Sequence, residues 1–269
     1  MSVIAVWGKN GSGRSTIAAN LAVFLAKQGD LVGLVGASKT YGSIQHYLGI
    51  DIPEEKSLKN ALESINEDDI VKSFVQHSKV KDLFILSLSN SDNCLKLRSI
   101  KEDVGKRLFL NTKDKFDHFI IDCTENFTDT ITMIGCQFAD CILEIIKPTI
   151  QSAAFRKSQE ELVESLKLKE KLISIANCNK DLITINDFEH SSKLKFAQVL
   201  PYSKNVENSE NTGEPISLLG AANRTDKEYL KGISQIADLI NKNSKQTLEA
   251  NKSSSKFKFI YKKRGGSYD

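Results

Sequence analysis

The chain has 269 residues, of which 40% are hydrophobic and 26% charged, an ordinary composition for a globular protein that buries a substantial core. No apolar run approaches the ~20 residues that a membrane-spanning helix needs, and the short uncharged start does not resemble a signal peptide. These features argue against an integral membrane protein and predict a cytoplasmic one.

Short apolar segments alternate with helical patterns along the first 240 residues. We expect a strand over residues 3–7, then a glycine-rich loop, then a helix over residues 15–27 that ends at Gly29. Further strands are predicted over residues 31–35, 83–88, 116–121, 141–146 and 172–176, and a late helix over residues 226–241. Apolar strands separated by helices predict an α/β fold, a mainly parallel β-sheet with helices on both faces. Ligands of such sheets bind at the carboxyl ends of the strands.

The C-terminal segment differs from the body in charge. Residues 241–269 carry eight lysines and arginines against two acidic residues, so they have a net charge of +6, and residues 1–240 carry −3. We therefore expect one folded domain at residues 1–242 and a basic, flexible tail at residues 243–269.

Aromatic residues alternate with lysines in this tail, at Phe257, Phe259 and Tyr261, and do not form an apolar stripe at helical spacing. Such a segment suits three kinds of binding. It could add as a strand to the sheet edge of a partner protein, insert at an anionic membrane surface, or stack on the bases of DNA. We rank the partner protein first, with a peripheral membrane location and DNA contact as alternatives. The remaining alternative is a solvated tail without a binding role.

Cysteines and histidines show no arrangement that predicts a metal or catalytic site. The five cysteines lack a C-x-x-C pair and are expected to be free thiols: Cys94, Cys123, Cys136, Cys141 and Cys178. The four histidines are scattered and are expected to be surface or packing residues: His46, His77, His118 and His190.

The glycine-rich loop after the first strand matches the pattern G-x-x-x-x-G-[K/R]-S. Its residues, named here the phosphate loop, are Gly8, Lys9, Asn10, Gly11, Ser12, Gly13, Arg14 and Ser15. Glycines allow backbone N–H groups to turn toward phosphate oxygens, and the following helix adds its positive N-terminal end. The Ser15 hydroxyl is placed to ligate Mg²⁺. The sequence therefore predicts a nucleotide phosphate site.

The same segment carries a family resemblance. Residues 9–16, from Lys9 to Thr16, are similar to the deviant Walker A motif of the ParA/MinD family of P-loop ATPases. Residues 116–122 resemble the Walker B strand of that family, which ends here at Asp122, and residues 139–148 resemble its next strand. The resemblance covers roughly residues 2–240 and is specific only at the motifs.

This resemblance implies ATP and Mg²⁺ as ligands, and a nucleotide-linked homodimer. In the family the early lysine, here Lys9, reaches the partner's nucleotide, so Lys9 is the catalytic candidate. The implied nucleotide-binding residues are Gly8, Lys9, Asn10, Gly11, Ser12, Gly13, Arg14, Ser15, Thr16, Asn177 and Pro201. Asn177 and Pro201 would lie beside the base, whereas Ser15 and Asp122 would hold Mg²⁺.

Two departures from the family pattern bear on activity. Arg14 replaces the usual lysine, and its planar fork is not equivalent to a compact ammonium at the phosphates. Gly36 and Ser38 stand where the family has two aspartates, the second of which positions the attacking water. A serine cannot act as that carboxylate. We therefore expect nucleotide binding with weak or no ATP hydrolysis.

These features predict an ATP-binding, dimerising switch that positions or scaffolds another machine. The degenerate motif is similar to the TadZ/CpaE-like branch, which localises pilus-assembly machinery, and DNA or plasmid partition is the next choice. Two alternatives belong to other classes. One is a P-loop enzyme that transfers phosphate to a small metabolite, and the other is an interaction protein whose nucleotide site is dead.

Overall fold

The computed structural model describes residues 1–97, 100–179 and 183–263, and the side chains of residues 1–97, 100–177 and 183–243. The expected free thiol of Cys178 lies outside the described side chains, as do the aromatic residues of the tail.

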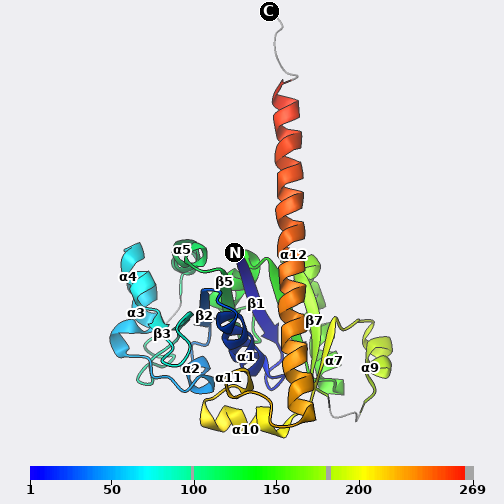
Figure 1. Ribbon diagram of the computed structural model, residues 1–269. Coiled ribbons are helices and arrows are strands. Elements are labelled where there is room, and N and C mark those ends of the chain that lie inside the picture. Colours follow the sequence, from blue (N-terminus) through cyan, green and yellow to red (C-terminus); the bar gives the residue numbers. More distant parts are fainter. Residues whose placement is uncertain (98–99, 180–182, 264–269) are drawn as a thin grey trace, which may run out of the picture.

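Eight strands form one sheet in the order β3-β4-β2-β5-β1-β6-β7-β8 (Figure 1). The strands are β1 (Ser2–Gly8), β2 (Val32–Gly36), β3 (Val75–Gln76), β4 (Leu83–Leu86), β5 (His118–Asp122), β6 (Cys141–Ile146), β7 (Leu172–Asn179) and β8 (Gln198–Pro201). Every neighbouring pair is parallel except β3 and β4. The mainly parallel sheet confirms the predicted fold class.

Helices cover both faces of the sheet, because the strands are apolar on both sides. The α-helices are α1 (Arg14–Lys27), α2 (Ile44–Tyr47), α3 (Leu58–Glu63), α4 (Glu67–Lys72), α5 (Glu102–Thr112), α6 (Thr130–Phe138), α7 (Ile150–Ser158), α8 (Glu160–Ser165), α9 (Ile185–Ser192), α10 (Lys204–Thr212), α11 (Ile216–Leu219) and α12 (Arg224–Lys263). Short 3₁₀ turns lie at Glu54–Lys56, Lys113–Lys115 and Lys169–Lys171.

Alternate residues of the strands enter two separate cores. Ile4 and Val6 of β1 pack with α1, α2, α11 and α12, whereas Val3, Ala5 and Trp7 pack with α3, α4, α5 and α6. This two-sided burial explains why the strands read as continuous apolar runs and lack a polar face.

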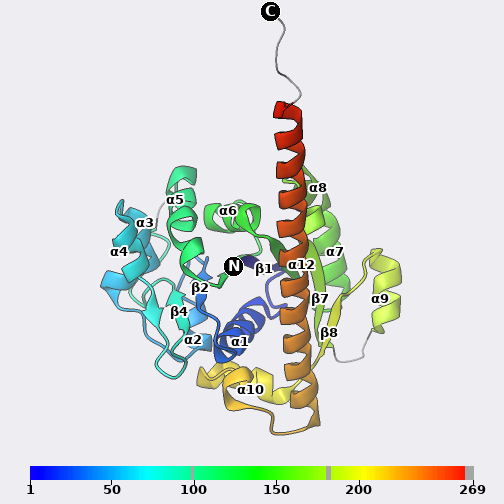
Figure 2. The ribbon, with the colours of Figure 1, turned by 45° about the horizontal axis from the view of Figure 1, so that its top comes forward.

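The C-terminal helix α12 passes along the sheet and continues beyond the body in both views (Figures 1 and 2). The sequence predicts a helix that ends near residue 241 and a flexible tail from residue 243. In the structure α12 runs to Lys263, so no change of element marks a boundary at residue 243. An extended strand over residues 257–261, as strand addition to a partner would need, is not the observed conformation. The domain boundary itself stays a prediction.

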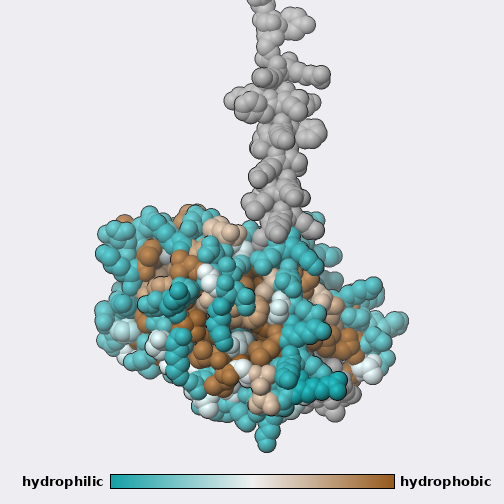
Figure 3. All heavy atoms as spheres, in the orientation of Figure 1, coloured by the Kyte–Doolittle hydropathy of each residue, from teal (hydrophilic) through white to brown (hydrophobic). Residues whose placement is uncertain are grey.

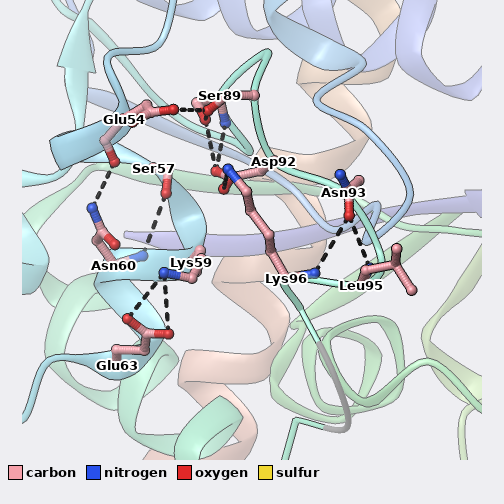
Figure 4. Close-up of polar contacts among 11 residues, drawn as sticks. Glu54, Ser57, Lys59, Asn60, Glu63, Ser89, Asp92, Asn93, Leu95 and Lys96 are labelled. Carbon is pink, nitrogen blue, oxygen red and sulfur yellow. Dashed lines mark hydrogen bonds and ion pairs between the residues drawn. The ribbon is translucent and has the colours of Figure 1, made fainter.

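The connection after β4 is held by side-chain hydrogen bonds (Figure 4). The Asp92 carboxylate accepts hydrogen bonds from the Ser89 backbone N–H (3.2 Å) and from the Ser89 hydroxyl (2.8 Å). Beside it, the Gln45 amide of α2 donates to the Leu88 carbonyl at 2.8 Å. The Gln45 bond joins this part of the sheet's carboxyl edge to α2.

The surface is mostly hydrophilic in the view of Figure 3, and its hydrophobic areas are separated from one another. Within the described residues, no helix is long and apolar enough to cross a membrane.

Two histidines have packing roles, as expected. His77 is 3% exposed, and its Nδ1 accepts hydrogen bonds from the N–H groups of Lys79 and Val80. His118 is also buried, and its Nδ1 lies 2.7 Å from the Ser2 hydroxyl.

Candidate functional site

A cavity of about 760 Å³ lies at the carboxyl ends of the parallel strands, where ligands of such sheets bind. Nine of the expected site residues line it: Asn10, Gly11, Gly13, Arg14, Ser15, Thr16, Asp122, Asn177 and Pro201. The structure therefore brings together side chains from β5, β7 and β8 around the phosphate loop. Gly8, Lys9 and Ser12 do not line this cavity.

The phosphate loop turns between β1 and α1 at glycines with positive φ. Gly13 has a φ of 89°, and a Cβ atom there would lie 2.2 Å from the Asn177 side-chain nitrogen. That nitrogen donates a hydrogen bond of 2.8 Å to the Ser12 carbonyl. Gly13 thus allows Asn177 to pack directly on the loop and to brace it. The sequence-based expectation places Asn177 beside the base, and this brace was not foreseen.

The N-terminus of α1 offers unpaired donors to the cavity. In the described part of the chain, no acceptor bonds the backbone N–H groups of Gly13, Arg14, Ser15 or Thr16, and α1 has no side-chain cap. Uncapped N–H groups at a helix N-terminus bind anions, because the groups and the helix dipole both favour negative charge. The geometry therefore fits phosphate oxygens.

Ser15 and Asp122 form a pair at the base of the loop. The Ser15 hydroxyl donates to Asp122 Oδ2 at 2.7 Å, and Asp122 Oδ1 is buried without a hydrogen-bond partner in the described structure. Burial raises the pKa of Asp122 to about 6, although the Ser15 hydrogen bond and the nearby Arg14 act to lower it. A buried carboxylate oxygen without a hydrogen-bond partner and a neighbouring hydroxyl are oxygen ligands of the kind that Mg²⁺ binds. Phosphate oxygens and waters would complete the coordination shell.

No group of three or more metal-binding side chains occurs among the described residues, so the protein alone does not form a closed metal site. Mg²⁺ characteristically binds through one or two protein ligands together with waters and substrate phosphates. The Ser15–Asp122 pair thus fits a cation that arrives with a nucleotide.

Arg14 bonds to the loop that carries it. Its guanidinium donates to the Gly8 carbonyl (2.9 Å) and to the Asn10 side-chain oxygen (2.6 Å). Lysine has no fork with which to make both bonds in this way. The substitution therefore gives the phosphate loop an internal brace at the position where the family has a phosphate-binding lysine.

Glu125 is a cavity residue that the sequence analysis missed. Its carboxylate accepts a hydrogen bond of 2.7 Å from the backbone N–H of Asn10, in the phosphate loop. Its own carbonyl accepts a bond from the Trp7 indole at 3.2 Å. The signal available in the sequence was a second carboxylate three residues after Asp122, in the loop that leaves a Walker B-like strand.

Lys9 lies away from the cavity, next to a small hollow shared with Glu144 and Arg156. Glu144 is 1% exposed, and its carboxylate pairs with the Arg156 guanidinium at 2.7 Å and accepts from the Ser174 hydroxyl at 2.8 Å. Burial raises the pKa of Glu144, and Arg156 opposes that rise. Lys9 is therefore set apart from the carboxylates and donors of its own phosphate site.

The wall after β2 contains hydroxyls and one lysine. This β2 wall, defined as residues 38–43, has no carboxylate. The Ser38 and Thr40 hydroxyls lie 3.0 Å apart, and the Lys39 ammonium lies 3.5 Å from Asp129. Burial raises the pKa of Asp129, while Lys39 lowers it. Lys39 was not expected as a site residue, because its pairing with Asp129 is a tertiary contact.

The opposite wall is formed by α10 and the end of β8. The Thr16 hydroxyl donates to Glu210 at 2.5 Å, which joins α1 to α10. Burial, followed by the Glu210 and Asp122 carboxylates, raises the pKa of Tyr47 to about 12. Tyr47 therefore remains a neutral phenol in the cavity at physiological pH.

The two walls meet at a pair of glycines. A Cβ atom on Gly49, just after α2, would lie 2.8 Å from the Gly213 carbonyl, and one on Gly213 would lie 2.7 Å from the Gly49 Cα. No other residue type fits at either position without moving α2 and α10 apart.

Acidic groups outnumber basic ones around the cavity. The carboxylates are those of Asp122, Glu125, Asp129, Glu207 and Glu210, and the cations are Arg14, Lys39 and Lys147. A free nucleoside triphosphate would be repelled by this lining, whereas a complex with a divalent cation carries less negative charge. The site therefore suits a metal-bound nucleotide better than a free one.

Comparison with known proteins agrees with this architecture. A family model described as an AAA domain matches residues 1–170. The septum site-determining protein MinD of Thermotoga maritima is 25% identical over 231 residues, which span 81% of each chain.

Solved structures share the fold at lower identity. MinD of Pyrococcus horikoshii, in complex with Mg-ADP, has a TM-score of 0.73 at 17% identity, covering 90% of this chain and 99% of that one. A ParA family ATPase of Chlorobium tepidum has a TM-score of 0.74 at 18% identity, covering 87% of this chain and 99% of that one. The chain therefore belongs to the AAA domain family and is a P-loop protein of the ParA/MinD type.

Proposed function

We propose that this protein binds ATP with Mg²⁺, dimerises around the bound nucleotide, and acts as a positioning or scaffolding switch with weak or no ATP hydrolysis. The observation that carries the proposal is the combination of unbonded N–H groups at the start of α1 with the hydrogen bond between Ser15 and the buried Asp122. The Mg-ADP complex of P. horikoshii MinD supports the choice of ligand.

The chain's own residues would divide the work of binding. The N–H groups of residues 13–16 would donate hydrogen bonds to phosphate oxygens, and the α1 dipole adds to their attraction. Ser15 and Asp122 would hold Mg²⁺, which when bound neutralises and orients the phosphates. Asn177 keeps the loop in shape through its bond to Ser12, and the base lies toward Asn177 and Pro201 on β7 and β8.

Weak hydrolysis follows from the β2 wall. No carboxylate is available there to orient a water, and Ser38 bonds to its neighbour Thr40. Other carboxylates of the cavity already have partners. Asp122 pairs with Ser15, and Asp129 pairs with Lys39. A bound triphosphate would therefore persist, which suits a switch better than a fast enzyme.

Lys9 is the residue that would link nucleotide to dimerisation. It lies outside its own cavity, beside the Glu144–Arg156 pair, which leaves its ammonium for a partner's phosphates. The alternative role is screening of its own subunit's phosphates.

Mass measurement in solution with and without Mg-ATP tests binding and dimerisation together. We expect a monomer without nucleotide and a dimer with it, and calorimetry at millimolar Mg-ATP should give a binding heat. Lys9→Ala should bind ATP and remain monomeric, whereas Lys157→Ala, an exposed lysine of α7, should behave as the parent. Absence of both heat and thermal shift would overturn the proposal and favour a dead nucleotide site.

The cargo is proposed from the resemblance and from the charge of the C-terminal segment. A TadZ/CpaE-like role in localising pilus assembly is our first choice, and ParA-like DNA partition is the second. The +6 charge of residues 241–269 favours an anionic partner, first an acidic protein, then an anionic membrane or DNA. Deletion of residues 243–269 should preserve ATP binding and abolish recruitment of the partner. Full partner binding by the truncated protein would exclude the segment.

A phosphotransferase remains the alternative enzyme class. It would need a base positioned for an acceptor, and the partnered carboxylates described above do not favour it. Phosphate transfer from ATP to a small acceptor at an ordinary enzymatic rate would establish that class.

A further inference from the structure

The loop after β5 is held against β1 and the phosphate loop by two groups of Glu125, its backbone carbonyl and its side-chain carboxylate. The Trp7 indole donates to the Glu125 carbonyl, and the Asn10 N–H donates to its carboxylate at 2.7 Å. The preceding residue, Thr124, bonds through its N–H to the Thr132 hydroxyl of α6 at 2.9 Å. Glu125 is therefore held at a defined place by its own backbone and by its neighbour.

The order of the strands indicates which part of a nucleotide meets this carboxylate. Asn177 and Pro201, the residues expected beside the base, lie on β7 and β8, on one side of β1. Glu125 follows β5, which lies on the other side of β1. A nucleotide with its base over β7 and β8 and its phosphates on the loop extends its terminal phosphate toward β5. The Asn10 N–H would then face that terminal group.

A carboxylate and a phosphate oxygen compete for the same kind of donor. Both are anionic acceptors of a backbone N–H, and such charge-assisted bonds are stronger than neutral ones. A terminal phosphate that approached Asn10 would meet a donor already bonded and a negative charge beside it. A diphosphate lacks the terminal phosphate, so it would not approach the Asn10 N–H or the Glu125 carboxylate.

We propose that Glu125 is an internal competitor for the terminal phosphate, and that it lowers the affinity of the site for nucleoside triphosphate relative to diphosphate. The inference rests on the proposed nucleotide binding and adds a residue that sets specificity within it. Displacement of the Glu125 side chain from Asn10 is then a required step of triphosphate binding.

The test compares the affinities of Mg-ADP and a non-hydrolysable Mg-ATP analogue by calorimetry for the parent, Glu125→Ala and Glu125→Gln. We expect Glu125→Ala to tighten binding of the analogue about tenfold, the magnitude of one charge-assisted hydrogen bond, with ADP affinity nearly unchanged. Glu125→Gln keeps an acceptor and loses the charge, so its effect should be smaller. Glu207→Gln, a charge change on α10 in the same cavity, is the matched control and should not alter the ratio of the two affinities.

Equal changes for the two nucleotides, or the same ratio change in Glu207→Gln, would overturn the inference. ADP binding by the parent tests the proposed function separately, since it does not involve Glu125. If the parent binds neither nucleotide and Glu125→Ala binds the analogue, the competitor role stands. If no variant binds either nucleotide, the proposed function and this inference both fail. Thermal unfolding of each variant checks that the fold is kept.

Discussion

The phosphate loop and the β2 wall face the same cavity and differ in which functional groups of the family pattern they retain. The loop has free N–H groups at the start of α1, and its Ser15 pairs with the buried Asp122 in an arrangement suited to Mg²⁺. The wall has Ser38 where the family pattern has the water-positioning aspartate, and Gly36, at the end of β2, stands in place of the other aspartate. Under the proposed function, phosphate binding and water activation depend on different segments, so the chain keeps the first with the loop and loses the second with the wall.

The largest effect is expected on the loop side, at Asp122. Asp122→Asn removes the charge that would hold Mg²⁺, so Mg-dependent nucleotide affinity should fall by ~100-fold, at the upper end of what altered metal sites show. Calorimetry with and without Mg²⁺ measures this loss. Asp103→Asn, an exposed change on α5, should leave the affinity unaltered. If Asp122→Asn binds Mg-ATP as the parent does, the metal lies elsewhere.

Asp122 should also make the nucleotide-free fold sensitive to pH. Its folded-state pKa of about 6 lies above the ordinary 3.8, so the neutral carboxyl favours folding at low pH, and this contribution is lost as pH rises through 6. Asp122→Asn should therefore stabilise the protein at pH 7.5 by about 2–3 kcal/mol and have little effect near pH 4. Denaturant unfolding at the two pH values measures the difference. A stabilisation that is equal at both pH values would show that ionisation is not its cause.

On the wall side, Ser38→Asp should raise the steady-state ATPase rate. A carboxylate at this position could orient a water toward the terminal phosphate, and we expect an increase of at least ~10-fold, below the full range for acid–base catalysis because Arg14 remains. Thr40→Asp adds the same charge to the same wall two residues later and is the control. Equal rates in the two variants would indicate that residue 38 is not the water-orienting position.

A smaller effect is expected from Arg14→Lys. The substitution breaks the bonds to Gly8 and Asn10 and supplies a compact ammonium, so Mg-ATP affinity should rise by roughly 3- to 10-fold while stability falls by ~1 kcal/mol. Calorimetry and thermal unfolding measure the two changes. Arg224→Lys, on an exposed arginine of α12, should change neither. Weaker ATP binding in Arg14→Lys would mean that the guanidinium itself contacts the phosphates.

The sequence predicted the fold because its signals are local. The strand over residues 141–146 was predicted with the observed bounds, and the first helix differs by one residue at its start. The glycine spacing of the phosphate loop also predicted a strand–loop–helix unit. The two-residue strand β3 was not predicted, because it is too short to show a period and is defined by its pairing with β4.

The parts of the site that escaped prediction are contacts between distant segments. Glu125 meets Asn10 across 115 positions of sequence, and Asn177 meets Ser12 across 165. The pairing of Lys39 with Asp129 has the same origin. Such contacts depend on the strand order of the folded sheet, which one sequence does not specify. Arg14 was recognised as a departure, but its role as a brace appears only in its hydrogen bonds.

The Gly49–Gly213 contact has a mechanical consequence. Because neither residue has a side chain, the chain after α2 and the end of α10 are in backbone-to-backbone contact at this point. Close-packed contacts of this kind are hard to compress, so they transmit displacements. α2 follows the β2 wall, and α10 carries Glu207 and Glu210, which line the cavity together with Pro201. The two sides of the cavity are thus in direct backbone contact at one point, so we expect a displacement of α2 to be passed on to α10.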